Sequence, residues 1–365
     1  MVRSMYLPNS APINRMFGFL KAFSDMGCEV EAVFLDANPA KANVVIPHVE
    51  FKYCWDGLLK WGKSLRTALS FVYAAHYVRT IPKGSNVLLL GTDSYLPLFL
   101  RRQDLKIYYE TTEHPSLSRK IFGMKRYVEQ CRRLKHIFVI SQALKDFYVA
   151  NGISHDRVSI VNMTVDPSRF VGLTKQTGVK RYIAYCGTAS NCKDGVDELI
   201  KAFAICHKQH PDVFLYIIGA TPDKEDKAGN LALIKSLGIE DSIVFTGIVD
   251  SSQMPQLLKN AEVLALDRPD SLQAKNGFPT KLGEYLLTEN PVVVTKVGDI
   301  PLFLKDGVSA LLCEERNPQA FAAKLCWALE HPQEASLIGK AGKEVALHSF
   351  DCHIECKKII TVIND

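Results

Sequence analysis

The stretch Asn276–Thr295, with the sequence NGFPTKLGEYLLTENPVVVT, contains a loop, a helix and a strand in close succession. Glycine and proline predict a loop at 276–279, the apolar spacing predicts a helix at 280–288, and three valines predict a buried strand at 292–294. A loop that leads directly into a helix presents unpaired backbone N–H groups and the positive end of the helix dipole, which suits a phosphate. Lys281 adds a cation, and Glu284, one turn further, is placed to accept hydrogen bonds from sugar hydroxyls. A solvated Lys281–Glu284 pair on an ordinary surface helix is the alternative.

Strands and helices alternate on both sides of this stretch, and we predict two successive α/β domains. The first half contains predicted strands at 2–7, 29–35, 86–91, 106–110, 136–140 and 159–162, and helices at 13–26, 57–80 and 119–133. The second half contains predicted strands at 182–186, 213–219, 242–245, 263–266 and 310–313, and helices at 196–209, 227–237, 253–258, 318–330 and 335–348. A proline- and glycine-containing segment at 167–180 reads as the linker. We therefore expect domains at 1–172 and 173–349, a C-terminal helix at 350–365 that packs back on the first, and a ligand in the cleft between them.

Composition limits the class of protein. The chain has 365 residues, 47% of them apolar and 23% charged, which is typical of a soluble globular protein. No apolar run is long enough to span a membrane, no secretory signal is recognisable, and the ten cysteines are scattered, so we expect reduced thiols in a cytoplasmic protein. Residues 1–172 carry 23 basic and 14 acidic side chains, a net +9, whereas the remainder carries 21 and 25, a net −4. The basic half suits an anionic acceptor or membrane surface, and no nucleic-acid-binding motif is present.

Three other sites carry candidate chemistry. The glycine-bounded loop 187–195, with Lys193, is a second candidate phosphate cradle, and together with Lys281 it suits a diphosphate. His114, in a turn after a strand, is placed to hydrogen-bond a sugar or the reacting oxygen, or is an incidental polar residue. Asn14 and Arg15 open the first helix, and Arg15 contacts an anionic acceptor or pairs with a nearby acid. The cysteines and histidines of 348–356 match no zinc signature, so we predict no metal site.

Several blocks of the sequence resemble those of a known family. The blocks YCGTASNCKDGVDELIKAF, FLYIIGA, IVFTGIVDSSQMPQLLKNAEVLAL, NGFPTKLGEYLLTENPVVVT and VGDIPLFLKDGVSALLC resemble, in order, the C-terminal half of retaining glycosyltransferases of family 4. HIFVISQALKDFYVANGI, VDPSRF and NRMFGFLKAFSDMGCEVEAV resemble the first half more loosely. The resemblance implies the GT-B fold, in which two Rossmann-like domains face each other across a cleft.

The resemblance also implies roles for individual positions. Glu284 matches the glutamate that binds the nucleotide ribose, Lys193 the phosphate-binding lysine, and Val249 the position that meets the base. Asn276 stands where the family has the glutamate that contacts the donor sugar, and Thr188 stands where it has an arginine, so Lys281 is expected to supply the missing charge. The backbone along the diphosphate matches Gly277, Phe278, Pro279 and Thr280. His114 falls near the family's N-domain histidine, and Asn14 and Arg15 replace a glycine-rich first loop on the acceptor side.

These matches imply a metal-independent hexosyltransferase that uses a nucleotide-sugar as co-substrate, needs no cofactor and retains configuration. The implied acceptor is a glycan or a lipid-linked molecule, in polysaccharide or lipopolysaccharide biosynthesis at the inner membrane face. Two alternatives remain open. Nucleotide-sugar 2-epimerases share the fold and need no acceptor, and the changes at Asn276 and Thr188 also fit a catalytically inactive glycan-binding or scaffold subunit.

Overall fold

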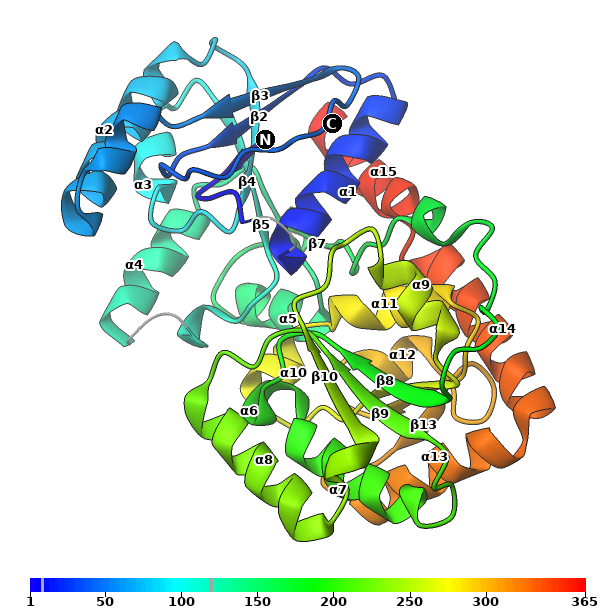
Figure 1. The fold of residues 1–365 in the computed structure, drawn as a ribbon. Helices are drawn as coiled ribbons and strands as arrows, with labels where there is room; N and C mark the ends of the chain where they lie inside the picture. The colour runs from blue at the N-terminus through cyan, green and yellow to red at the C-terminus, as the bar shows by residue number, and fades with distance from the viewer. Residues whose placement is uncertain (8–9, 118–120) are drawn as a thin grey trace. The chain divides into compact units, whose positions relative to one another are not determined.

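The computed structural model describes residues 1–7, 10–117 and 121–365. The chain divides into two compact units: unit 1 comprises 1–164 and 352–365, and unit 2 comprises 165–351. Each unit contains a parallel β-sheet with helices, so the predicted α/β class is confirmed (Figure 1). Within the described ranges, no helix combines the length and the apolar character needed to cross a membrane.

Unit 1 is built on one parallel sheet with the classical doubly wound strand order. Its described strands lie in the order β3 (Val49–Tyr53), β2 (Val30–Phe34), β1 (Val2–Arg3), β4 (Asn86–Leu90), β5 (Lys106–Thr111), β6 (His136–Val139) and β7 (Val158–Ile160). Its helices are α1 (Ala11–Asp25), α2 (Lys63–Thr80), α3 (Leu96–Phe99), α4 (Ile121–Cys131), α5 (Gln142–Ala150) and α15 (Cys352–Asn364), with short 3₁₀ turns η1 (Asp56–Lys60), η2 (Pro115–Leu117) and η3 (His155–Arg157).

Unit 2 repeats the plan. Its strands lie in the order β10 (Ile243–Gly247), β9 (Phe214–Ile218), β8 (Tyr182–Cys186), β11 (Val263–Leu266), β12 (Val292–Thr295) and β13 (Leu311–Cys313). Its helices are α6 (Asn191–Asp194), α7 (Val196–His207), α8 (Lys224–Leu237), α9 (Met254–Asn260), α10 (Leu272–Asn276), α11 (Thr280–Leu287), α12 (Ile300–Phe303), α13 (Pro318–Glu330) and α14 (Pro332–Ser349), with 3₁₀ turns η4 (Pro167–Phe170) and η5 (Glu240–Ser242). The residues of β8, β11 and β12 that pair across the sheet centre are all buried, as expected for a sheet covered on both faces.

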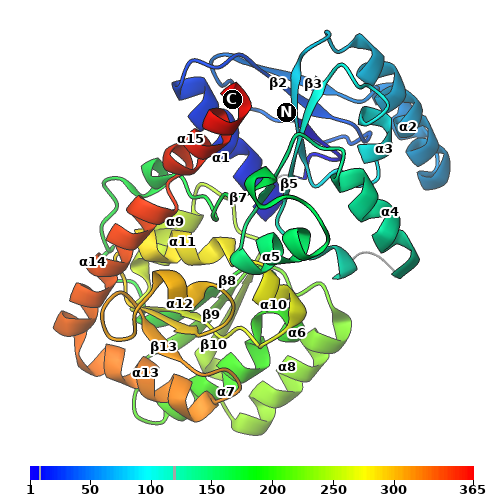
Figure 2. The ribbon, with the colours of Figure 1, turned by 180° about the vertical axis from the view of Figure 1, so that it is seen from behind.

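The C-terminal helix α15 belongs to unit 1, where it contacts α1 (Figure 2). Cys352 and Cys356 of α15 are part of the buried core formed with α1, and His353 Nε2 lies 2.8 Å from the Asp25 carboxylate. The predicted domain boundary at 172 falls inside unit 2, because the chain already packs into unit 2 from Val165 onward. The Val165 N–H donates to the Phe350 carbonyl at 2.8 Å, and the side chain of Phe170 is buried.

The predicted helix at 57–80 is interrupted at Gly62, which separates η1 from α2. The spacing of leucine and valine in 57–80 predicts that Leu65 and Val72 face inward, and this prediction is wrong: their exposed fractions are 46% and 54%. The buried face of α2 instead contains Tyr73, whose ring lies edge-on to Trp55 with centroids 5.2 Å apart. The helical spacing of leucine and valine did not reveal that Tyr73 lies on the buried face of α2. Of the predicted basic helix at 119–133, α4 accounts for Ile121–Cys131, and Arg119 and Lys120 lie outside the described residues.

Candidate donor-binding site

The loops of unit 2 meet at the point where its strand order reverses. β8 has β9 on one side and β11 on the other, so the connections that follow β8 and β11 leave the sheet in opposite directions. In open α/β sheets, ligands bind at the carboxyl ends of the strands at this switch point. The two loops touch through their backbones: a Cβ atom on Gly195, which has φ +58°, would lie 2.1 Å from the Asp267 carbonyl oxygen. Glycine is therefore required where these loops cross.

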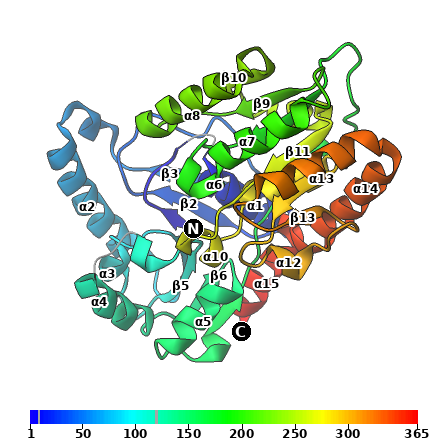
Figure 3. The ribbon, with the colours of Figure 1, turned by 90° about the horizontal axis from the view of Figure 1, so that it is seen from below.

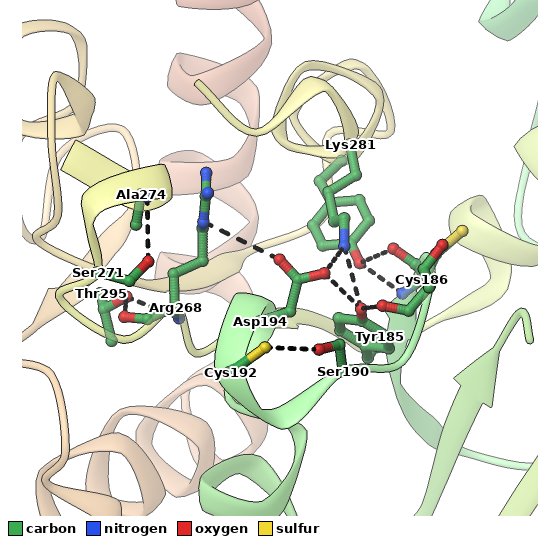
Figure 4. A network of polar contacts seen from close by, with 12 residues as sticks. Tyr185, Cys186, Ser190, Cys192, Asp194, Arg268, Ser271, Ala274, Lys281 and Thr295 are labelled. Atoms are coloured by element: carbon green, nitrogen blue, oxygen red, sulfur yellow. Dashed lines mark hydrogen bonds and ion pairs between the residues drawn. The ribbon is translucent and has the colours of Figure 1, made fainter. Parts of the chain in front are cut away.

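A buried charge network occupies this switch point (Figure 4). Asp194, at the end of α6, forms an ion pair with the Lys281 ammonium and accepts a 2.7 Å hydrogen bond from the Tyr185 hydroxyl. The Lys281 Nζ also donates to the Tyr185 hydroxyl oxygen at 3.1 Å, and Arg268 Nε lies 3.9 Å from the second Asp194 oxygen. The network joins β8, α6, α11 and the loop after β11, so it fixes the relative positions of these segments.

Burial alone would raise the pKa of the Asp194 carboxyl, but the neighbouring Lys281 ammonium, the Tyr185 hydroxyl and Arg268 hold that pKa below its usual range. Gly187 leaves room for the lysine: a Cβ atom there, at φ +151°, would lie 2.3 Å from the Lys281 Nζ. We expected Lys281 to be the cation that replaces the family's arginine at a phosphate. The structure instead gives its ammonium an anionic partner inside unit 2.

Arg268 is a cation that the sequence analysis did not single out. It follows β11, and it is 4% exposed. Its Nε is buried without a hydrogen bond among the described residues, and its ion pair with Asp194 is long. Burying guanidinium donors without acceptors is unfavourable, so an anion beside them would lower the energy of the site. The sequence feature that could have identified Arg268 is a charged side chain two positions after a buried strand.

The predicted phosphate loop at 187–195 lies after β8. Lys193 is half-buried in α6, and no described salt bridge involves it. Thr188 is exposed, and its carbonyl accepts a 2.8 Å hydrogen bond from the Tyr185 hydroxyl. The loop is thus held by its backbone, while the Lys193 side chain is available to a ligand.

Glu284 lies on α11, and its carboxylate forms an ion pair with Arg169 of η4. The same guanidinium donates to the Ser251 carbonyl at 3.0 Å, so it links α11 to the loop after β10. Arg169 was not among the predicted site residues, because nothing in the sequence indicates a pair 115 positions apart. Val249, the predicted base contact, is half-buried in that same loop beside Ile248, which is 80% exposed.

The segment before α11 differs from the predicted loop. Asn276 ends helix α10, and its side-chain amide donates to the Leu272 carbonyl at 2.9 Å, one turn back. Gly277 is extended, and Phe278 is buried against Phe303, with ring centroids 5.5 Å apart. Pro279 is the N-cap of α11 and Thr280 its first residue. The backbone at 277–280 therefore leads into a helix N-terminus as predicted, while the side chain of Phe278 has a packing role.

The predicted acceptor-side residues lie in unit 1. Arg15 is 5% exposed, pairs with Glu110 at 2.8 Å, and donates to the carbonyls of Val161 and Asn162. The structure thus favours the second alternative for Arg15, a pair with a nearby acid, because its donors are used inside the unit. Asn14 is exposed on the first turn of α1. His114, beyond β5, contacts Ser116 Oγ through Nδ1 at 2.6 Å, and partial burial lowers its pKa.

Asp267 gives a stability prediction. Burial, with Glu198, Asp197 and Glu315 nearby, raises its pKa to about 7, and its Oδ2 is buried without a hydrogen bond. An unfolded aspartate titrates near pH 3.9, so between about pH 4 and 7 the folded state binds more protons and loses stability as the pH rises. Asp267→Asn stays neutral. The free energy of unfolding of the variant, measured with urea, should therefore rise relative to that of the wild type by about 1–4 kcal/mol between pH 4 and pH 8. Asp241→Asn, at an exposed site, is the control and should show no such gain. The burial account would be contradicted if Asp267→Asn gained no stability relative to the wild type, or gained only as much as Asp241→Asn.

Known proteins resemble this chain in sequence and in fold. The family described as glycosyl transferases group 1 matches residues 175–345. D-inositol 3-phosphate glycosyltransferase of Segniliparus rotundus is 25% identical over 164 residues, which cover 45% of this chain and 35% of that protein. A GDP-mannose-dependent phosphatidylinositol monomannoside mannosyltransferase of Mycolicibacterium smegmatis is 24% identical over 223 residues, which cover 60% of this chain and 55% of that protein. The chain thus spans about a third to a half of the length of these curated relatives.

Among solved structures, Anabaena Alr3699/HepE in complex with UDP and glucose superimposes with a TM-score of 0.77 at 17% identity, over 100% of this chain and 99% of that one. At this identity the likeness shows the fold. The predicted GT-B architecture of two Rossmann-like domains is therefore confirmed.

Proposed function

We propose that this protein transfers a hexose from a nucleotide-sugar to an acceptor with retention of configuration, because residues 175–345 match the family described as glycosyl transferases group 1. The observation that carries the proposal is the switch point of unit 2, where Asp194, next to Lys193 in the chain, contacts both Arg268 and Lys281 in the first turn of α11. Such an arrangement stabilises negative charge that develops on a leaving diphosphate.

The proposal assigns a role to each residue of the donor site. Lys193 and Arg268 contact the diphosphate, with Arg268 in place of the arginine absent at Thr188. The backbone of 277–280 lies along the same group. Glu284, oriented by Arg169, accepts hydrogen bonds from the ribose hydroxyls, and the backbone at Val249 meets the base. Asn276 and His114 are proposed to contact the transferred sugar, so the chemistry rests on positioning and charge stabilisation rather than on a covalent nucleophile.

The cations of this proposed site are side chains, so transfer is expected to need no magnesium or manganese. A direct test supplies UDP-glucose or GDP-mannose with glycan or lipid-linked acceptors, in buffer with and without EDTA, and follows the anomeric configuration of the product by NMR. Retained product in both buffers supports the proposal. Inverted product, conversion of the donor without any acceptor, or activity that only magnesium or manganese restores would each contradict it.

The exposed face of α2 supports an acceptor at a membrane surface. Trp61, just after η1, is 46% exposed, Leu65 and Val72 of α2 are 46% and 54% exposed, and Lys60 and Lys63 near the start of α2 are exposed too. Apolar side chains flanked by cations suit the headgroup layer of an anionic membrane, where each cation contributes about 1 kcal/mol. We propose that this basic apolar face binds such a surface reversibly.

The protein should therefore sediment with anionic vesicles at low salt and be released at high salt, because salt screens exposed charges. Lys60→Glu with Lys63→Glu should abolish this sedimentation. The same double change at Lys224 and Lys227, exposed on α8 of unit 2, is the control and should leave it intact. Equal recovery of the wild type with neutral and anionic vesicles would contradict the membrane role.

A further inference from the structure

Two thiols and an imidazole meet on the helices of unit 2, at the edge of the sheet opposite the donor loops. Cys206 lies in the last turn of α7, and the His210 N–H donates to the Cys206 carbonyl at 3.1 Å, so His210 continues that helical turn. Cys326 lies in α13, which packs on α7 (Figure 3). Both helices run back from the carboxyl ends of their strands, so their last turns lie near the amino edge.

The donor atoms of these three side chains already converge. The two Sγ atoms and one His210 ring nitrogen all lie within 4.8 Å of one another. The His210 Nε2 is buried without a hydrogen bond, and it lies 3.4 Å from an oxygen of Glu330, one helical turn after Cys326. Each helix thus supplies two ligands at i and i+4 spacing, Cys206 with His210 and Cys326 with Glu330.

We propose that Cys206, His210, Cys326 and Glu330 form a tetrahedral site for a divalent cation of the zinc class. In tetrahedral zinc sites, with bonds of about 2.0–2.3 Å, the ligand atoms are roughly 3.3–3.8 Å apart, so a small contraction brings Cys206, His210 and Cys326 to this spacing. The partly exposed Glu330 side chain, now 3.4 Å from His210 Nε2, would turn toward the metal as the fourth ligand. Binding releases one proton from each thiol and leaves two thiolates on the metal.

The surroundings favour a structural role. Cys206 is 1% exposed and Cys326 8%, whereas the Glu330 side chain is 46% exposed and marks the route from solvent. With four protein ligands the cation has no open position, which is the pattern of a structural site rather than a catalytic one. The cation would fasten α13 to α7. Sequence analysis missed it because the two ligand pairs stand about 120 positions apart and match no zinc signature.

Metal analysis of the reduced protein tests the site, independently of any transferase activity. We expect one zinc per chain, and after its removal cobalt(II) should restore a tetrahedral spectrum with thiolate charge-transfer bands. His210→Ala and Glu330→Gln, which leave the cysteines in place, should weaken cobalt binding at least tenfold for the histidine and less for the glutamate. His331→Ala and Cys28→Ser are the matched controls and should bind as the wild type.

Circular dichroism verifies that each variant is folded. The proposal is overturned if the reduced wild type gives no cobalt–thiolate bands, if His210→Ala binds cobalt as the wild type does, or if mass spectrometry of the freshly purified protein shows a Cys206–Cys326 disulfide instead of zinc.

Discussion

Replacing Lys281 with methionine is expected to lower the free energy of unfolding by about 3–5 kcal/mol. The change leaves the buried Asp194 carboxylate without its main counter-ion, since Arg268 lies 3.9 Å away and Tyr185 supplies only a neutral donor. Methionine keeps most of the side-chain volume, so the loss reports the charge and not a cavity. Urea unfolding at neutral pH measures it.

A double-mutant cycle separates the pair from the rest of the network. Asp194→Asn combined with Lys281→Met removes both charges and should recover a large part of the loss, because no unpaired ion remains buried. Lys275→Met breaks the exposed pair with Asp270 and should cost at most about 1 kcal/mol. Additive losses in the double variant would show that Asp194 and Lys281 act independently.

The second large effect concerns nucleotide binding. Glu284→Gln is expected to weaken the affinity for a nucleoside diphosphate by about 1.5–3 kcal/mol, the range for hydrogen bonds to a charged group. The amide also loses its ion pair with Arg169, so the α11 side chain is held less firmly toward the ribose. Isothermal titration with UDP and GDP measures the change.

Glu262→Gln serves as the control for this substitution, since it removes an exposed carboxylate that pairs with Lys175 immediately before β11. It should bind both nucleotides as the wild type does. An unchanged affinity in folded Glu284→Gln would remove Glu284 from the donor site.

The sequence predicted the strands and helices of unit 2 well, because buried parallel strands are short apolar runs and their helices repeat every 3.6 residues. It also located the non-helical backbone that leads into α11, since glycine and proline interrupt the helical pattern there. It did not reveal the ion-pair partner of Lys281, because a sequence displays a charge without showing what lies beside it. The Asp194–Lys281 pair joins positions 87 apart.

The same reason explains what was missed. Arg268 and Arg169 stand in segments that read as ordinary loops, and only folding brings them to Asp194 and Glu284. In α2, by contrast, the error was one of periodicity. Exposed Leu65 and Val72 follow a plausible inward pattern, yet Tyr73 and Val78 occupy the buried face.

The most direct test of the donor site is titration of Lys193→Met alongside the wild type with UDP and GDP. Lys193 is half-buried, so methionine should leave the fold intact. We predict that the wild type binds at least one of the two nucleotides at a single site, and that Lys193→Met binds it at least tenfold more weakly, which corresponds to about 1.4 kcal/mol. If neither nucleotide binds the wild type, or if Lys193→Met binds with unchanged affinity, the switch point of unit 2 does not hold the donor diphosphate as proposed.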